Sequence, residues 1–247
     1  MDYDATFAKR GRSYKYAMDT YPHAMDAEFQ TAVRVCGLSA GDVLLNIPAA
    51  CIPLPVPPDV NYLCYETNAS FAALTGLPCC SLGAIPLLDG SVDVIVTLAS
   101  LHHATDEERA AFYTEARRLL KPGGRLLIGD VASGSAQDAW LNQFVDAHNS
   151  SGHRGRFWSC SDAGLLSSCG FSVEVSEQSY TWGFPSWEAA IDFSRHLFGL
   201  DLATDAQISE GLQRHLSPVR HEGGGVCVPW SLLYFTSIVA PALSPTP

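Results

Sequence analysis

Residues 86–131 read PLLDGSVDVIVTLASLHHATDEERAAFYTEARRLLKPGGRLLIGDV, and this stretch decides the fold. Its apolar run Val92–Leu98 predicts a buried strand. Thr105-Asp-Glu-Glu108 is a capping-box pattern that begins a helix, and Lys121-Pro-Gly-Gly124 ends it. Residues 125–131, which read RLLIGDV around the apolar centre 126–128, predict a second strand. A strand, a capped helix and a strand within about forty residues form a βαβ crossover, which implies a parallel sheet with helices on its faces.

The same alternation continues on both sides of this unit. Apolar periodicity predicts strands at 43–47, 62–65 and 172–178, helices at 14–36, 187–198 and 204–216, and a last strand that begins at Val226. The order contains no internal repeat and no linker-like run, so we expect one domain spanning residues 1–247.

The charge balance argues against a nucleic-acid substrate. Fifteen Lys and Arg residues stand against 26 Asp and Glu residues, which gives a formal net charge of -11. Proteins that bind tRNA, rRNA or DNA neutralise phosphates with a basic surface. This sequence has no basic stripe, so we expect no nucleic-acid partner.

Cysteine usage and hydropathy favour a cytoplasmic protein. The eight cysteines show no metal or redox spacing, which is typical of reduced thiols in the cytosol. The start, MDYDATFAKRGRSYKY, lacks the apolar stretch of a signal peptide. The apolar segment Val226–Leu243 contains Pro229 and Pro241 and a β-rich centre, which favours a buried strand over a membrane span.

Three motifs at matching spacing carry a family resemblance. They are residues 85–95 (IPLLDGSVDVI), Leu101-His-His103 and Leu119-Leu-Lys-Pro-Gly-Gly-Arg125. Together they resemble a class I S-adenosylmethionine (SAM)-dependent methyltransferase, of the small-molecule branch that includes the ubiquinone and malonyl-carrier-protein enzymes. The resemblance runs from about residue 14 to residue 241. It implies an α/β fold with a doubly wound, seven-stranded, mostly parallel sheet whose last strand is antiparallel.

The resemblance also divides the chain. It implies a helical N-terminal cover (1–40), a core (41–182), a helical insert (183–225), the last strand (226–241) and a loose tail (242–247).

SAM is the cofactor that the resemblance implies, held at the carboxyl ends of the central strands. Glu66 corresponds to the acidic residue that holds the ribose, the Ala49-Ala50 loop faces the methionine end, and Ser81 and Leu82 border the adenine. The full set of cofactor-binding residues that the resemblance implies is Asn46, Ala49, Ala50, Glu66, Thr67, Ser81, Leu82 and Leu98.

The cofactor loop departs from the family pattern. Residues 42–51 read DVLLNIPAAC without one glycine, and Pro48 stands where the first glycine is expected. Glycines at this loop let the backbone approach the cofactor, because a Cβ would intrude. Two interpretations follow. The chain is a divergent SAM-dependent methyltransferase, or it is a SAM-independent protein of the same fold: a pseudo-enzyme, a partner subunit, or a repurposed lyase or cyclase.

The methyltransferase interpretation predicts a small acceptor. The Asn-Pro-Pro-Tyr motif of enzymes that methylate exocyclic nitrogens is absent, and Leu98-Ala-Ser-Leu101 stands in its place. This favours an oxygen, carbon or carboxylate as the methylated group. Aromatic residues in the N-terminal segment and the later helical region suggest an apolar or aromatic ligand, although core packing also explains many of them. Self-association or a partner subunit is compatible with either interpretation.

Two adjacent histidines are the candidate catalytic residues. His102 and His103 follow the strand 92–98, and histidine suits a base near neutral pH. The alternative is that one of them packs structurally or caps the turn before Thr105. The histidines at 148, 153, 196, 215 and 221 lack metal-site spacing, so we expect surface or loop positions for them and no metal.

Overall fold

The computed structural model describes residues 3–52 and 54–239. The expected tail, 242–247, and the end of the expected last strand, 240–241, lie outside the described residues.

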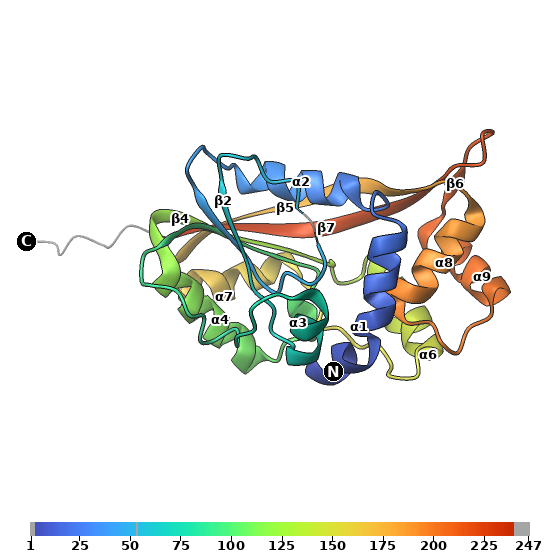
Figure 1. Ribbon diagram of the computed structural model, residues 1–247, viewed down its shortest axis with the longest axis horizontal. Coiled ribbons are helices and arrows are strands. Elements are labelled where there is room, and N and C mark those ends of the chain that lie inside the picture. Colours follow the sequence, from blue (N-terminus) through green and yellow to red (C-terminus); the bar gives the residue numbers. More distant parts are fainter. Residues whose placement is uncertain (1–2, 53, 240–247) are drawn as a thin grey trace, which may run out of the picture.

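Seven strands within the described ranges form one sheet in the order β2-β1-β3-β4-β7-β5, with β6 paired to β7 (Figure 1). Their bounds are β1 Val43–Asn46, β2 Asn61–Cys64, β3 Val92–Leu98, β4 Leu120–Asp130, β5 Phe171–Phe184, β6 Val219–Arg220 and β7 Val226–Val239. Strands β1 to β4 pair in parallel, whereas β7 runs antiparallel to β4, β5 and β6. The predicted seven-stranded α/β sheet with an antiparallel last strand is confirmed.

Helices cover both faces of the sheet (Figure 1). Their bounds are α1 Tyr3–Thr20, α2 Asp26–Cys36, α3 Ala69–Thr75, α4 Asp106–Leu119, α5 Ala136–Ala139, α6 Asp146–His148, α7 Ala163–Ser168, α8 Trp187–Phe198 and α9 Asp205–Leu216. A π-helical segment, Trp140–Val145, joins α5 to α6, and short 3₁₀ turns lie at Leu101–His103 (η1) and Cys160–Asp162 (η3).

The central strands explain this layering, because they are apolar on both sides. Leu44 and Val94 belong to one core with residues of α1, α2, α8 and α9. Leu45 and Ile95 point the other way, into a second core with α4 and α7. Alternate residues of a strand face opposite sides of a sheet, so continuous apolar runs require helices on both faces.

The predicted capping box positions α4. Thr105 Oγ1 accepts a hydrogen bond from the backbone N–H of Glu108 at 3.2 Å, and the Glu108 carboxylate accepts one from the Thr105 N–H at 2.7 Å. These bonds satisfy two donors that a helix start leaves without intrahelical partners.

The strand predicted at 172–178 is longer than expected, because β5 continues to Phe184. β5 and β7 pair along their whole length, whereas β4 pairs only with Leu233–Ile238 of β7. Residues 178–184 of β5 and 226–232 of β7 therefore project beyond the parallel part of the sheet. We call this projection the overhang. Helices α8 and α9 pack against it, and α1 packs against α8 (Figure 1).

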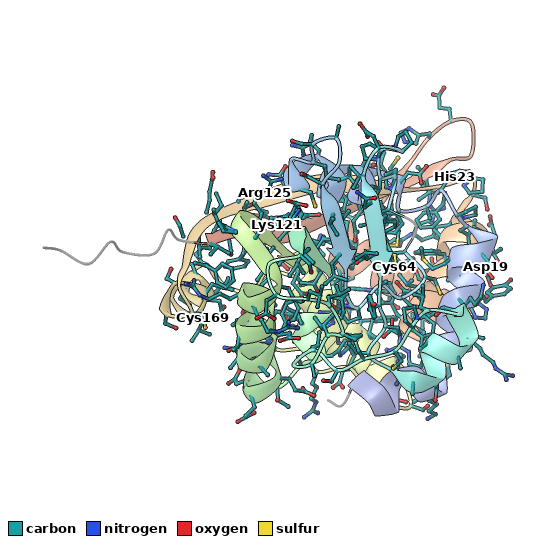
Figure 2. The ribbon with its side chains drawn as sticks, turned by 60° about the vertical axis from the view of Figure 1, so that its left-hand side comes forward. Asp19, His23, Cys64, Lys121, Arg125 and Cys169 are labelled. Carbon is teal, nitrogen blue, oxygen red and sulfur yellow. The ribbon has the colours of Figure 1, made fainter. Side chains whose placement is uncertain are left out.

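Ion pairs join the amino-terminal end of β4 to neighbouring segments of the sheet. Figure 2 labels Lys121 and Arg125 on this part of the strand. Lys121 Nζ lies 2.7 Å from Asp93 Oδ2, and Arg125 Nη2 lies 3.5 Å from Asp42 Oδ2. The opposite edge, where the parallel strands end, is where a doubly wound sheet binds ligands. No helix in the described part of the chain has the length and apolar character needed to cross a bilayer.

A substitution at Gly129 of β4 tests how tightly this strand packs against Leu98 of β3 and Tyr234 of β7. A Cβ at this position would lie 2.7 Å from Tyr234 Cε1 and 2.9 Å from Leu98 Cδ2. We expect Gly129→Ala to lower the free energy of unfolding by about 1–3 kcal/mol, as overpacking does. Gly164→Ala, in α7 with open space around it, is the control and should raise that free energy by about 0.5–1 kcal/mol. Urea unfolding of both variants measures the difference, and equal stability would show that β7 yields easily.

Candidate functional site

Two hollows open where the parallel strands end. The outer cleft has a volume of about 310 Å³, and its lining includes Pro48, Thr67, Ser81, Leu82, Ser100 and Leu101. The histidine chamber has a volume of about 90 Å³, which is room for a few water molecules or one small ring. Its polar lining is Arg10, Glu28, His102, His103 and His153, and its aromatic lining is Tyr14, Trp182, Phe198 and Trp230.

The segment after β3 separates the two hollows. Ser100 and Leu101 line the outer cleft, whereas Ala99, His102 and His103 line the chamber. Ala99 has a φ of 43°, and its backbone N–H donates to the carbonyl of Gly129 at 2.7 Å. A positive φ at a non-glycine residue persists only when its surroundings hold it. The segment is therefore fixed to β4.

Asp130, at the end of β4, holds the histidine turn η1. Its carboxylate is fully buried. It accepts hydrogen bonds from His102 Nδ1 at 2.7 Å and from the backbone N–H groups of His102 at 3.1 Å and Val131 at 2.8 Å. Because a carboxylate only accepts, His102 Nδ1 carries a proton and donates the hydrogen bond to Asp130.

His153 joins the two histidines from the loop after α6. Its backbone N–H donates to Asp146 Oδ1 at 2.8 Å, and its ring stacks on Phe157 with centroids 6.1 Å apart. One nitrogen from each of His102, His103 and His153 lies within 4.8 Å of the other two. His153 lies in a loop, as the surface-or-loop expectation allows, but it is buried, with 4% of the residue exposed.

Burial keeps two of these histidines neutral. It lowers the pKa of His103 well below the ordinary value, and nearby positive charge, that of Arg10 included, lowers it further. Burial and the charge of Arg10 also lower the pKa of His153. Both rings therefore keep a lone pair at neutral pH, which is the form that binds a metal or accepts a proton.

Glu28 is a buried carboxyl in the chamber wall. It lies on the apolar face of α2, is 1% exposed, and its Oε2 accepts a hydrogen bond from Trp182 Nε1 at 2.8 Å. Burial raises the pKa of Glu28 to about 7, and the Trp182 hydrogen bond opposes that rise only in part. A group with such a pKa can accept or donate a proton near neutrality.

Arg10 brings a positive charge to the same wall. Its Nη2 donates to the carbonyl of Leu197 at 2.8 Å, and its buried Nε has no hydrogen-bond partner among the described residues. Burial lowers the pKa of Arg10 to about 10, so the side chain remains charged at neutral pH. Gly199 makes room for it, because an added Cβ there would lie 2.5 Å from Arg10 Nε.

The glycine-free loop after β1 folds onto Glu66. Ala50 has a φ of 47°, and its backbone N–H donates to Glu66 Oε2 at 2.9 Å. The N–H groups of Thr67 and Asn68 donate to Oε1 at 2.7 and 3.1 Å. The Glu66 side chain is fully buried under these contacts.

The residues fit SAM at one end and not at the other. Thr67, Ser81 and Leu82 meet in the outer cleft, whose volume is at the lower end of the range for ligand pockets. A nucleobase can therefore enter beside Ser81 and Leu82. Ribose hydroxyls cannot reach Glu66 in this conformation, because the Ala50 backbone occupies one carboxylate oxygen and covers the group.

The other residues that the resemblance implied lie outside the outer cleft. Ala49 and Ala50 line a separate hollow of about 330 Å³ together with Asp19 of α1 and Cys64 of β2, both labelled in Figure 2. Asn46 is buried, and its Nδ2 donates to the Tyr62 hydroxyl at 2.9 Å. Leu98 is packed in the core.

Sequence reasoning missed four residues of the chamber region: Arg10, Glu28, Asp130 and His153. Two of them had a local signal, since Glu28 interrupts an apolar helical stripe and Asp130 ends an apolar strand. A charged residue in such a position must find a partner when it is buried. Arg10 and His153 had no such signal, because only the tertiary fold brings them to the chamber.

Comparisons with known proteins agree with this architecture. Residues 64–128 match the family model described as a methyltransferase domain. The uncharacterized protein YafE of Escherichia coli K12 is 38% identical over 72 residues, which are 28% of this chain and 33% of YafE. The chain spans a third or less of the length of the curated relatives it matches.

Two solved structures illustrate the fold. The YcgJ protein from Bacillus subtilis has a TM-score of 0.58 at 18% identity, covering 87% of this chain and 99% of YcgJ. The [4+2]-cyclase SpnF has a TM-score of 0.55 at 15% identity, covering 88% of this chain and 81% of SpnF. At these identities the likeness shows the fold alone. The chain therefore contains a stretch that matches a methyltransferase domain and has the overall fold of class I methyltransferase structures.

Proposed function

We propose that the protein is a SAM-dependent methyltransferase that acts on an oxygen, carbon or carboxylate of a small apolar or aromatic molecule. The observation that carries this proposal is the pair of hollows on either side of Ala99–His103. The outer cleft suits the base of a nucleoside, and the histidine chamber suits a small ring. Both open at the strand ends where this fold binds its ligands.

The chamber supports an aromatic acceptor. Trp182 and Trp230 stack with centroids 4.1 Å apart, and Tyr14 and Phe198 complete an apolar wall. Aromatic rings recognise flat ligands through large contact areas and fixed geometry. The few polar groups among them would orient the ligand.

Glu28 is the group we assign to proton removal. An acceptor hydroxyl or acidic C–H loses a proton when it is methylated, and a carboxyl with a pKa of about 7 is matched to that task. Trp182 fixes the carboxyl by donating to Oε2, and Arg10 supplies a positive charge that favours an anionic acceptor. His102 and His103 would face the acceptor from the opposite segment of the chamber wall.

The contact between Ala50 and Glu66 favours a second candidate function. Because the loop backbone already occupies the Glu66 carboxylate, the fold could serve a ligand in the chamber without SAM. One protein of this fold is a [4+2]-cyclase. A lyase or cyclase reaction would use Glu28 and the histidines as acid and base and leave the outer cleft without a role.

Calorimetric titration with SAM and with S-adenosylhomocysteine separates the two functions. We expect binding with a Kd of about 1 µM or tighter, which corresponds to about -8 kcal/mol. Leu82→Trp should weaken binding at least about tenfold, because the indole would fill the base end of the outer cleft. Leu88→Trp, at a position 81% exposed and outside the lining of either hollow, is the matched control and should bind as the wild type does.

If folded, ligand-free wild type gives no heat of binding with SAM or S-adenosylhomocysteine, the methyltransferase function is excluded and the second candidate is favoured. Binding that Leu82→Trp does not change would place the nucleoside somewhere other than the outer cleft.

The Glu28 assignment predicts a pH dependence of stability. The pKa of Glu28 is about 7 in the folded chain and near the ordinary value in the unfolded chain. As pH rises from about 4.5 to about 7, the unfolded state loses this proton first, so folding becomes less favourable; above the folded pKa no further loss occurs. Glu28→Gln should therefore gain roughly 3 kcal/mol relative to wild type across this window.

Urea unfolding at a series of pH values measures that difference. Glu222→Gln, at an exposed position, is the control and should follow the wild-type curve. If the curves of Glu28→Gln and wild type stay parallel, Glu28 does not titrate in this range and is not the base.

A further inference from the structure

Three imidazoles converge on the histidine chamber from two separate segments. His102 and His103 come from η1, and His153 comes from the loop before η3. Their ring centroids are 4.1 Å (His102–His103), 5.5 Å (His102–His153) and 5.1 Å (His103–His153) apart. All three side chains are buried, and one nitrogen of each lies within 4.8 Å of the others.

The ring of His102 is oriented as metal-binding histidines usually are. Asp130 accepts from Nδ1, so Nε2 is the nitrogen left for a ligand. A carboxylate behind a histidine fixes its tautomer and increases its basicity as a ligand. Asp130 is itself held by two backbone N–H groups, so this support is rigid.

His153 adds an independent observation. Its Nδ1 is buried without a hydrogen-bond partner among the described residues. Buried polar atoms normally have a hydrogen-bond partner, and a buried nitrogen without one is unfavourable. A bound cation would satisfy this nitrogen.

The charges around the cluster allow a cation. Arg10 lines the same chamber and repels positive charge. Asp130 lies behind His102, and Glu28 lies in the chamber lining, so two carboxyl groups offset that repulsion. Three imidazoles with an open fourth position are the donor set of catalytic zinc sites, and imidazole also suits Cu, Fe and Ni.

We propose that His102, His103 and His153 bind one divalent transition-metal ion, with Zn²⁺ as the simplest occupant, and leave its fourth position open to the histidine chamber. Tetrahedral Zn–N bonds of about 2.0–2.1 Å place the nitrogens about 3.4 Å apart, so the rings must draw together by at most about 1.4 Å. The chamber volume at the open position holds a water molecule or one polar atom of a small ligand. This site does not depend on SAM.

Cobalt(II) titration tests the site directly. The full chain is purified without a histidine tag, stripped with a chelator, and titrated with Co²⁺ while visible absorption is recorded; Zn²⁺ is then added in competition. We expect the absorption of a four-coordinate nitrogen site, saturation at one ion per chain, and displacement by Zn²⁺. His153→Ala should raise the Kd for Zn²⁺ at least about 100-fold, and Asp130→Asn should raise it about 10–100-fold.

Two further variants make the test decisive. His153→Phe keeps a ring stacked near Phe157 without offering a ligand, so it should fold as judged by circular dichroism and lose the cobalt absorption. His23→Ala removes an exposed histidine and should bind as the wild type does. No absorption with folded wild type, or equal absorption in His153→Phe, would overturn the metal site. The outcome of the SAM titration does not affect this result.

Discussion

The buried carboxylate of Asp130 is the contact on which the rest of the site depends. It ends β4, accepts three hydrogen bonds, and ties the turn after β3 to the neighbouring strand. A fully buried charge is stable only with such partners, so the turn has little freedom to move. This turn separates the outer cleft from the histidine chamber. The Asp130 carboxylate also orients the His102 ring by accepting from its Nδ1. One acid therefore sets both the boundary and the chemistry of the site.

Much of the fold could be predicted from the sequence, because its elements have strong local signals. The capping box at Thr105 involves only residues up to Glu108, and the apolar strands lie directly before and after α4 in the sequence. The local pattern and the structure therefore agree. The site was less predictable. Glu28 and His153 lie far apart in sequence, and their contacts arise only when α2 and the loop after α6 pack around the same chamber.

Glu66 shows why a family pattern does not determine a contact. Its position after β2 matches the acid that holds ribose, yet its carboxylate binds the backbone of Ala50. A glycine would bring no Cβ near a ligand in that loop, whereas here the left-handed Ala50 backbone lies against the acid. Ala50 also adopts a left-handed φ that costs an alanine about 1–2 kcal/mol. The hydrogen bond to Glu66 helps to offset this cost.

The overhang of β5 and β7 separates ligand contact from sheet pairing. Trp182 and Trp230 lie on it, before the point at Leu233 where β4 joins β7. Substitution of these rings reshapes the chamber without disturbing the register of β1 to β4. Residues that shape the chamber and residues that hold the parallel strands in register therefore occupy different halves of the same two strands. A change of ligand preference through the overhang would leave the pairing of β1 to β4 intact.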